Sequence, residues 1–142
     1  MLRQAIMAEA RAWIGTPYRH QGATKGVGCD CLGLVRGVYR AVLGREPEQP
    51  GPYAPDWAES GGRDLLLDAA GRHCRTRPAG SMLAGDLIVF RWRPELPAKH
   101  AGILTGPESF VHAYSGSAVV ESALVPHWRR KIAGVFAFAH AT

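Results

Sequence analysis

The sequence predicts one α+β domain over residues 1–142, with N-terminal helices packed on an antiparallel sheet. Two observations lead to this fold class. The first half of the chain carries apolar residues at helical spacing, and the second half carries short β-prone runs separated by glycine or proline. Helices followed by strands, rather than alternating with them, are typical of α+β domains. The 142 residues, 46% of them apolar, suffice for one domain with its own core.

Residues 2–14 are expected to form the first helix. Their apolar side chains recur at helical spacing, with charged residues between them, at Leu2, Ile6, Ala10 and Trp13. The run Gly15-Thr16-Pro17 should end this helix. Residues 15–29 are rich in glycine and are expected to form a loop.

A second helix should begin directly after Asp30, because aspartate caps helix N-termini well. An apolar stripe at helical spacing follows, made of Leu34, Val35, Val38, Tyr39 and Val42. Gly44 should end the helix. This arrangement places Cys31 in the first helical turn.

The remaining elements follow from composition and spacing. Residues 45–56, rich in proline and polar groups, should form a loop that connects elements at the surface or borders a substrate cleft. A third helix is expected at about residues 57–70, with Leu65, Leu66 and Leu67 on its buried side. Residues 71–85 are expected to be irregular and basic. Short strands are then predicted at residues 86–92, 100–104, 109–114, 118–122 and 134–139.

The net charge of +5 would favour an anionic partner, such as nucleic acid, anionic lipid or an anionic cell-wall polymer. The longest basic cluster, Arg129-Arg130-Lys131, is short and is interpreted as a solvated turn. Because no basic ribbon with interleaved aromatic residues occurs, nucleic acid is not an expected partner. No apolar run approaches the ~20 residues of a membrane span. The charged N-terminal segment does not resemble a signal peptide, so we expect synthesis in the cytoplasm without one.

Cys31 is the candidate nucleophile. The unpaired N–H groups and the positive dipole end of a helix N-terminus favour the thiolate, which is the attacking form. The same N–H groups can hold an oxyanion, and Gly33 would leave that approach open. The alternative is that Cys31 is a small buried apolar residue.

His100 and His112 are the candidate partners of Cys31. They lie on two consecutive predicted strands, which could present both imidazoles toward the same helix end. One histidine would then act as base and the other would orient it. The alternative is a structural role in which backbone carbonyls satisfy both rings.

A zinc site was weighed against this catalytic interpretation. Metal-capable side chains occur at Cys29, Cys31, His100 and His112. Cys-x-Cys is not the usual zinc spacing and no second close pair exists, so neither a metal nor another cofactor is expected. Three cysteines are too few for a disulfide framework. Cys29 is interpreted as structural, and Cys74 lies in a basic segment with no evident partner.

Five segments, spread over roughly residues 5–115, resemble the motifs of the NlpC-type cell-wall peptidase family. They are Trp13-Ile14-Gly15-Thr16-Pro17-Tyr18, Asp30-Cys31-Leu32-Gly33-Leu34-Val35, Gly85-Asp86-Leu87-Ile88-Val89-Phe90, His100-Ala101-Gly102-Ile103 and Val111-His112-Ala113. Together, and in this order, they make the resemblance specific. It implies a papain-like α+β fold.

The resemblance also implies roles for five residues. Cys31 corresponds to the nucleophile, His100 to the general base, and His112 to the polar residue that orients the base. Tyr18 corresponds to a tyrosine near the nucleophile. Asp30 corresponds to an aspartate that helps relatives recognise the free amine of a stem peptide.

The resemblance implies cleavage of peptidoglycan beside D-amino acids, often between D-glutamate and a diamino acid. The segment Gly28–Gly37, together with the short length, looks closest to the tail peptidases of phages and gene-transfer particles. Peptidoglycan and other tail or baseplate proteins are therefore the expected partners, and a phage-like tail particle (virion) is the expected location. The alternatives are a structural tail component with a decayed site and a papain-fold amidase or acyltransferase acting on another amide.

Two positions depart from the family pattern. Arg19-His20-Gln21-Gly22 stands where relatives usually carry an aromatic residue and paired glycines. Leu32 stands where relatives often carry a serine that helps bind substrate. Neither departure affects the expected nucleophile or base.

Overall fold

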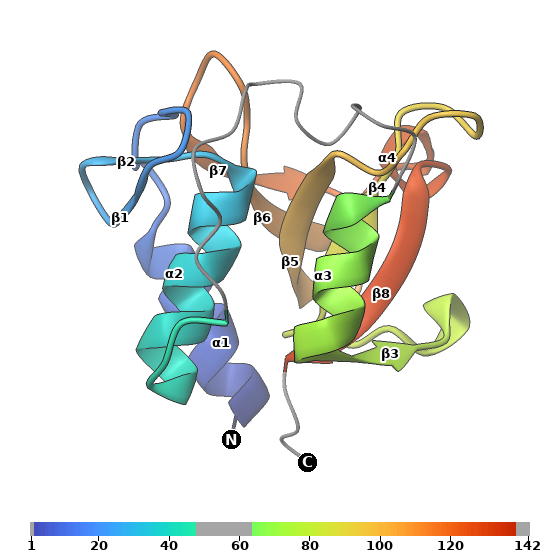
Figure 1. Ribbon diagram of the computed structural model, residues 1–142, viewed down its shortest axis with the longest axis horizontal. Helices are drawn as coiled ribbons and strands as arrows, with labels where there is room; N and C mark the ends of the chain where they lie inside the picture. The colour runs from blue at the N-terminus through green and yellow to red at the C-terminus, as the bar shows by residue number, and fades with distance from the viewer. Residues whose placement is uncertain (1, 48–63, 139–142) are drawn as a thin grey trace.

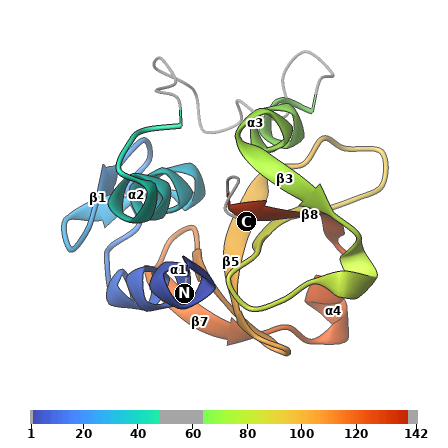
Figure 2. The ribbon, with the colours of Figure 1, turned by 90° about the horizontal axis from the view of Figure 1, so that it is seen from below.

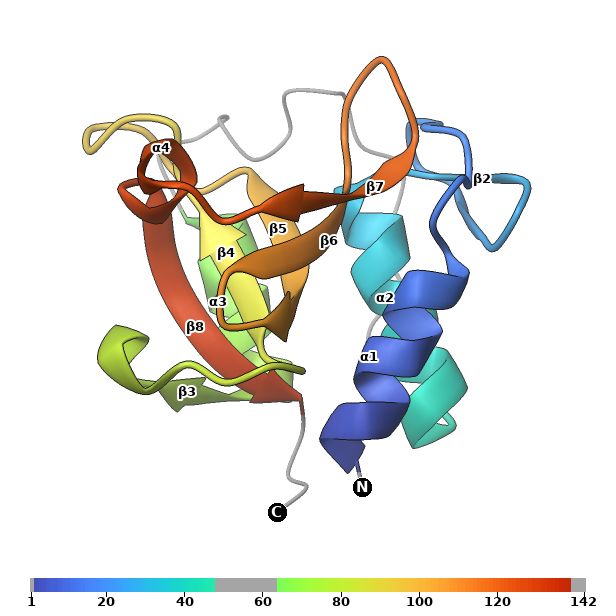
Figure 3. The same ribbon diagram turned by 180° about the vertical axis from the view of Figure 1, so that it is seen from behind.

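The computed structural model describes residues 2–47 and 64–138. Helices α1 (Leu2–Ala12) and α2 (Cys31–Leu43) lie side by side and pack against the central strand β5 (Figure 1). Helix α3 (Leu65–His73) packs instead on β3 and β8, at the other end of the sheet (Figure 2). Viewed from behind, the α1–α2 pair and β8 again lie at opposite ends of the molecule (Figure 3).

The sheet has six strands in the order β3-β8-β4-β5-β6-β7, and all neighbours are antiparallel. Its strands are β3 (Cys74–Arg77), β4 (Leu87–Phe90), β5 (His100–Gly106), β6 (Ser109–Ala113), β7 (Val119–Ala123) and β8 (Ile132–Phe138). A small hairpin of β1 (Ala23–Thr24) and β2 (Gly28–Cys29) precedes α2, a 3-10 turn (Ala79–Ser81) follows β3, and the short helix α4 (Pro126–Arg129) precedes β8. The α+β class with helices on an antiparallel sheet is confirmed.

Both faces of the sheet are buried. One face packs against the helices and includes Val89, Ala101, Ile103 and Val111. The other face forms a second apolar cluster of Ile88, Phe90, Leu104, Phe110 and Leu124. Because side chains alternate along a strand, neighbouring residues of β4 and β5 belong to different clusters. A residue's position along β5 therefore decides which half of the core its side chain joins.

The first two helices follow their sequence signals closely. In α2, Asp30 Oδ1 accepts a hydrogen bond from the Gly33 amide at 2.8 Å, which is an N-cap contact. Gly44 ends α2 with φ of 82°, a left-handed conformation that glycine adopts without strain. The crossing of α1 and α2 depends on Gly37, because a Cβ there would lie 2.2 Å from the Trp13 ring.

The third helix and the strands differ from the prediction in detail. Helix α3 continues to His73, beyond the expected end at residue 70, with Leu66 buried and its two leucine neighbours half-buried. Residues 57–63 of the expected helix, and residues 48–56 of the expected loop, lie outside the described residues. All five predicted strands are present with shifted ends.

Two expectations of irregular structure were wrong. Residues 74–77 form the edge strand β3, in which Cys74 pairs with Phe138 and Arg77 with Val135. An edge strand with mostly polar side chains lacks the apolar alternation that marks a strand in sequence. The segment 15–29 is not wholly a loop either, since it contains the β1–β2 hairpin.

A buried carboxylate ties α1 to the sheet. The Asp86 side chain is fully buried and its Oδ1 accepts a hydrogen bond from Arg3 of α1 at 2.7 Å. Its Oδ2 accepts from Arg77 of β3 at 3.0 Å and from the Leu83 amide at 2.8 Å. These contacts fix the start of β4 against α1, which in turn supports α2.

Each helix of the described ranges is too short or too polar to serve as a membrane span.

Candidate active site

Cys31 is the first residue of α2, directly after the N-cap. Its Sγ lies 3.8 Å from the carbonyl oxygen of Lys99, the residue before β5. A backbone hydrogen bond from Ala101 also reaches the sulfur. The thiol therefore lies against the backbone on both sides of His100.

The loop before α2 packs tightly onto the helix start. A Cβ on Gly33 would lie 1.7 Å from the Gly22 carbonyl oxygen, so only glycine allows this approach. Asp30 Oδ2 accepts a hydrogen bond from the Gln21 amide at 2.8 Å, and Gln21 itself has a positive φ of 66°. The missing side chain of Gly33 thus makes room for Gly22. The expectation that Gly33 leaves room for an oxyanion stays a prediction.

His100 and His112 are joined directly. His100 Nε2 and His112 Nδ1 lie 2.8 Å apart, and both residues are buried. Ile103 pairs with Val111 across β5 and β6, so Gly102 faces His112. A Cβ on Gly102 would lie 3.2 Å from the His112 Cβ, and its absence lets the His112 ring reach across to His100.

The hydrogen-bonded chain continues to Ser122 of β7, whose Oγ lies 2.9 Å from His112 Nε2. The sequence interpretation missed Ser122. A signal was nevertheless present, because the predicted alternation of strand 118–122 places Ser122 and Val120 on one face, and Val120 pairs with His112. The polar chain thus spans three adjacent strands and engages Nε2 of His100.

Aromatic rings surround His100 on the side away from the helices. Trp92 stacks on the imidazole with centroids 5.5 Å apart and planes inclined by 25°. Trp128 does the same at 5.8 Å and 29°, and Phe90 lies at 5.8 Å. The sequence interpretation noted Trp128 only as a neighbour of the basic cluster and gave Trp92 no role. These rings hold the imidazole in place and keep water from most of its surface.

Burial controls the protonation of the site. It raises the pKa of the Cys31 thiol to about 12, and the charge of Asp30 adds to this effect. Burial lowers the pKa of His100 to about 3, helped by the charges of His112 and Lys99, and lowers that of His112 to about 4. The helix start is expected to favour the thiolate, whereas burial and the Asp30 charge act in the opposite direction and favour the neutral thiol.

Tyr18 lies beside the nucleophile. Its backbone bridges to Cys29, and its amide donates to the Ser117 carbonyl at 3.1 Å. Burial raises the pKa of Tyr18, and the charges of Cys31 and Asp30 raise it further. The structure therefore brings Tyr18, Asp30 and Cys31 together.

Asp30 is buried, with 4% of its surface exposed. Its oxygens accept the Gly33 and Gln21 amides described above, and His20 Nδ1 lies 3.9 Å from Oδ2. These contacts give Asp30 a structural role at the helix start. Its role in binding a substrate amine stays a prediction.

The other metal-capable residues lie apart from this chemistry. Cys29 is completely buried in β2, in keeping with a structural role, and Cys74 begins the distant strand β3. Among the described residues, no group of three or more His, Cys, Asp or Glu side chains is arranged to hold a metal ion.

Comparison with known proteins agrees with this geometry. The sequence model of the NlpC/P60 family matches residues 15–137. The chain is 30% identical over 131 residues to murein DD-endopeptidase MepS/murein LD-carboxypeptidase of Escherichia coli, covering 92% of this chain and 60% of that protein. It is 30% identical over 138 residues to gamma-DL-glutamyl hydrolase of Bacillus subtilis, covering 96% of this chain and 30% of that protein. The chain thus spans less than two thirds of the length of either relative.

Comparison of the fold with solved structures points to the same family. The crystal structure of the NlpC/p60 domain of the peptidoglycan hydrolase SagA superposes with a TM-score of 0.67 at 26% identity, covering 96% of this chain and 98% of that domain. The shared fold includes the helix that carries Cys31 and the strands that carry both histidines. Since the family match extends over most of the described elements, the chain belongs to the NlpC/P60 family of papain-like cysteine peptidases.

Proposed function

We propose that this chain hydrolyses amide bonds in peptidoglycan stem peptides, of the D-glutamyl to diamino acid type. The observation that carries the proposal is the position of Cys31 against the start of β5, where a polar chain from β6 and β7 holds His100. The substrate class is supported by the relatives, which are named as a murein endopeptidase and a gamma-DL-glutamyl hydrolase.

Acyl transfer is the reaction that this arrangement serves. The thiol starts neutral, so His100 Nδ1 takes the proton from Cys31 Sγ as the sulfur attacks the substrate carbonyl. Backbone N–H groups at the start of α2 stabilise the oxyanion. Collapse of the tetrahedral intermediate breaks the C–N bond, and the leaving amine takes the proton from His100. Water then releases the acyl group, and His100 serves again as its base.

The polar chain is compatible with the tautomer that this reaction needs. His100 Nδ1 can accept a proton only if the ring carries its hydrogen on Nε2. Nε2–H then donates to His112 Nδ1, and His112 Nε2–H donates to the Ser122 hydroxyl oxygen. The same contacts stabilise the imidazolium that forms during attack.

The test is digestion of purified peptidoglycan, with muropeptides identified by mass spectrometry. Wild-type protein should release products cut after D-glutamate, and Cys31→Ser should release none while keeping its fold. Cys74→Ser is the matched control, because it removes a thiol on the edge strand β3, which lies on the far side of β8 from the strands that carry the two histidines, and should leave digestion intact. Digestion by Cys31→Ser at the wild-type rate would exclude the mechanism, and cleavage of another amide would replace the substrate.

We further propose that the chain acts as part of a phage-like tail particle, beside other tail or baseplate proteins. The support is the resemblance of the segment around the nucleophile, Gly28–Gly37, to tail peptidases. Mass spectrometry of purified particles should detect the chain at a fixed ratio to other tail proteins. Recovery of the chain only as free protein in the cytosol would contradict this location.

A further inference from the structure

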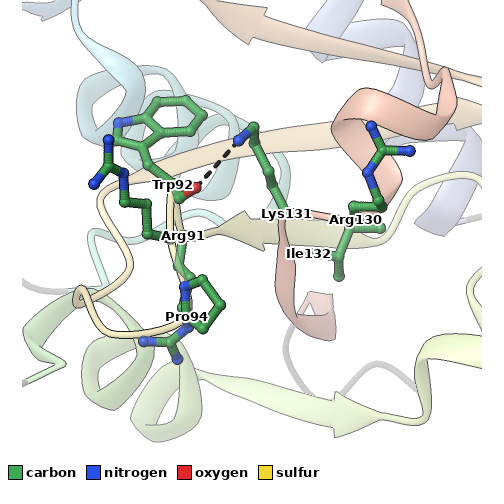
Figure 4. Close-up of a pocket in the computed structure, with 7 residues that line it drawn as sticks. Arg91, Trp92, Pro94, Arg130, Lys131 and Ile132 are labelled. Atoms are coloured by element: carbon green, nitrogen blue, oxygen red, sulfur yellow. Dashed lines mark hydrogen bonds between the residues drawn. The ribbon is translucent and has the colours of Figure 1, made fainter.

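A basic pocket lies beside the catalytic histidine, where β4 ends and β8 begins (Figure 4). It has a volume of about 470 Å³. Trp92 forms one wall, and the cations around it are Arg91, Arg93, Arg130 and Lys131. This is the cluster that the sequence interpretation treated in part as a solvated turn, whereas Arg130 and Lys131 line a hollow.

The four cations are not equally neutralised. Arg91 Nη1 lies 3.3 Å from Asp64 Oδ2, which balances its charge, and Arg93 lies 4.0 Å from Glu95 at the exposed surface. Lys131 Nζ donates to the Trp92 carbonyl at 3.1 Å, a neutral partner that leaves its charge unbalanced (Figure 4). Arg130 makes no ion pair with any residue in 2–47 or 64–138. Two positive charges therefore face the pocket without a carboxylate from the described chain.

The pocket is joined to the active site through Trp92. This ring lines the pocket and also stacks on His100 at 5.5 Å. The Arg91 amide donates to the Lys131 carbonyl at 2.8 Å, so the two walls are held together by backbone. A register shift between β4 and β8 occurs next to this pair, at Phe90. Such irregularities redirect side chains near functional sites, as they do here for Lys131.

We propose that this basic pocket binds a carboxylate of the substrate peptide close to the bond that Cys31 attacks. The inference rests on the proposed peptidase function and names a specificity site for it. Two unbalanced cations around a hollow of this size match one small anionic group. A long polyanion would instead require a row of cations along the surface, whereas a single hollow suits one compact group. Trp92 gives the peptide an apolar surface between the reacting carbonyl and the pocket.

The experiment compares two stem peptides that differ only in whether their carboxylates are free or amidated. Arg130→Gln and Lys131→Gln should each raise KM for the free-carboxylate peptide about tenfold with little change in kcat, the effect of losing one charge-assisted contact. The amidated peptide should bind the wild-type protein more weakly and should respond to neither substitution. Arg75→Gln is the matched control, because it removes an exposed arginine on β3, far from the pocket.

The outcomes separate this inference from the proposed function. If wild-type protein cleaves both peptides equally, or if the two variants keep the wild-type preference, the carboxylate pocket is wrong while the peptidase function stands. If wild-type protein cleaves neither peptide nor peptidoglycan, the peptidase function fails and the pocket inference with it. Loss of binding to a phosphate-rich wall polymer in Arg130→Gln, with unchanged peptide kinetics, would assign the pocket to that polymer and overturn the proposal.

Discussion

Cys31 is half-buried and His100 is buried, and the surroundings of both residues favour their neutral forms at neutral pH. Burial raises the pKa of the thiol to about 12 and lowers the pKa of the imidazole to about 3. A thiolate–imidazolium pair would therefore have to form during the reaction, because it would not be present in the free protein. Catalysis then depends on how well His100 is positioned to take one proton at the moment of attack.

Alkylation of Cys31 should report this resting state. Because a raised pKa lowers the thiolate fraction at any given pH, the rate of reaction with iodoacetamide should rise tenfold per pH unit from pH 6 to beyond pH 9, without a plateau. Mass spectrometry of the Cys31 peptide measures the rate, and the Cys74 peptide provides an internal comparison. A plateau beginning near pH 6 would show that the ion pair already exists in the free protein.

Ser122 should act as a positioning residue through His112. Replacing it with alanine removes the hydrogen bond at His112 Nε2 and frees the ring to take the wrong tautomer. Losing one hydrogen bond to a group that becomes charged costs about 1.5–3 kcal/mol, which is roughly 10-fold to 100-fold in rate. We expect this loss in kcat for Ser122→Ala, with KM unchanged, while Ser122→Thr keeps a hydroxyl and most of the rate. An equal fall for both variants would point to packing rather than to the hydrogen bond.

At the scale of elements, the site depends on how closely β5 and β6 approach at Gly102. A Cβ there would lie 2.9 Å from the Phe110 ring and 3.2 Å from the His112 Cβ. Any side chain at this position therefore pushes the His112 ring away from His100. The close approach of β5 and β6 thus requires a residue without a side chain at position 102.

Gly102→Val should consequently reduce turnover far more than it reduces stability. Overpacking costs about 1–3 kcal/mol of unfolding free energy, which a domain of this size can survive. Activity on peptidoglycan, however, should fall below detection once the two histidines separate. Gly71→Ala is the control, since a Cβ on this residue of α3 meets no atom within 4 Å. Full activity in Gly102→Val would show that the contact between the histidines is dispensable.

The sequence was most informative where one local signal decides a structure. Asp30 and Gly44 mark the ends of α2, and apolar alternation marks β4 to β8, so these elements could be placed from residue types alone. Edge strand β3 could not, because Arg75 and Arg77 give it no apolar pattern. The stacking of Trp92 on His100 and the contact of Lys131 with Trp92 follow from how distant segments pair, which no local pattern reveals.

Residue identity also did not determine the protonation of the site. The position of Cys31 at a helix start predicts a low pKa, whereas the pKa depends on how much of the thiol the rest of the fold covers. That quantity is a property of tertiary packing. The candidate nucleophile could thus be chosen from the sequence, but the protonation that its surroundings favour could not.

At the scale of the whole molecule, Asp86 connects parts that are distant in sequence. Its carboxylate accepts hydrogen bonds from Arg3 at the N-terminus, from Arg77 and from the backbone that leads into β4. A buried charge of this kind is stabilising only while its partners remain in place. Asp86 therefore links helix α1 to the sheet at a position away from Cys31 and His100.

Asp86→Asn should lower the free energy of unfolding by about 3–5 kcal/mol, the usual cost of breaking a buried ion pair. Urea titration followed by circular dichroism measures the change. Glu95→Gln removes a carboxylate whose side chain is 65% exposed and should leave the urea midpoint unchanged. An unchanged midpoint in Asp86→Asn would mean that packing alone holds α1 in place.

The two candidate catalytic residues, Cys31 and His100, lie next to different halves of the core, one on each face of the sheet. Cys31 is followed directly by Leu32, which packs against the cluster beneath the helices, whereas the His100 ring is held by Phe90 and Trp128 of the opposite cluster. The backbone from Lys99 to Ala101 contacts the Cys31 thiol and also carries the His100 ring. An evolving lineage can therefore replace residues in one cluster at a time, provided that this short stretch of main chain keeps its place.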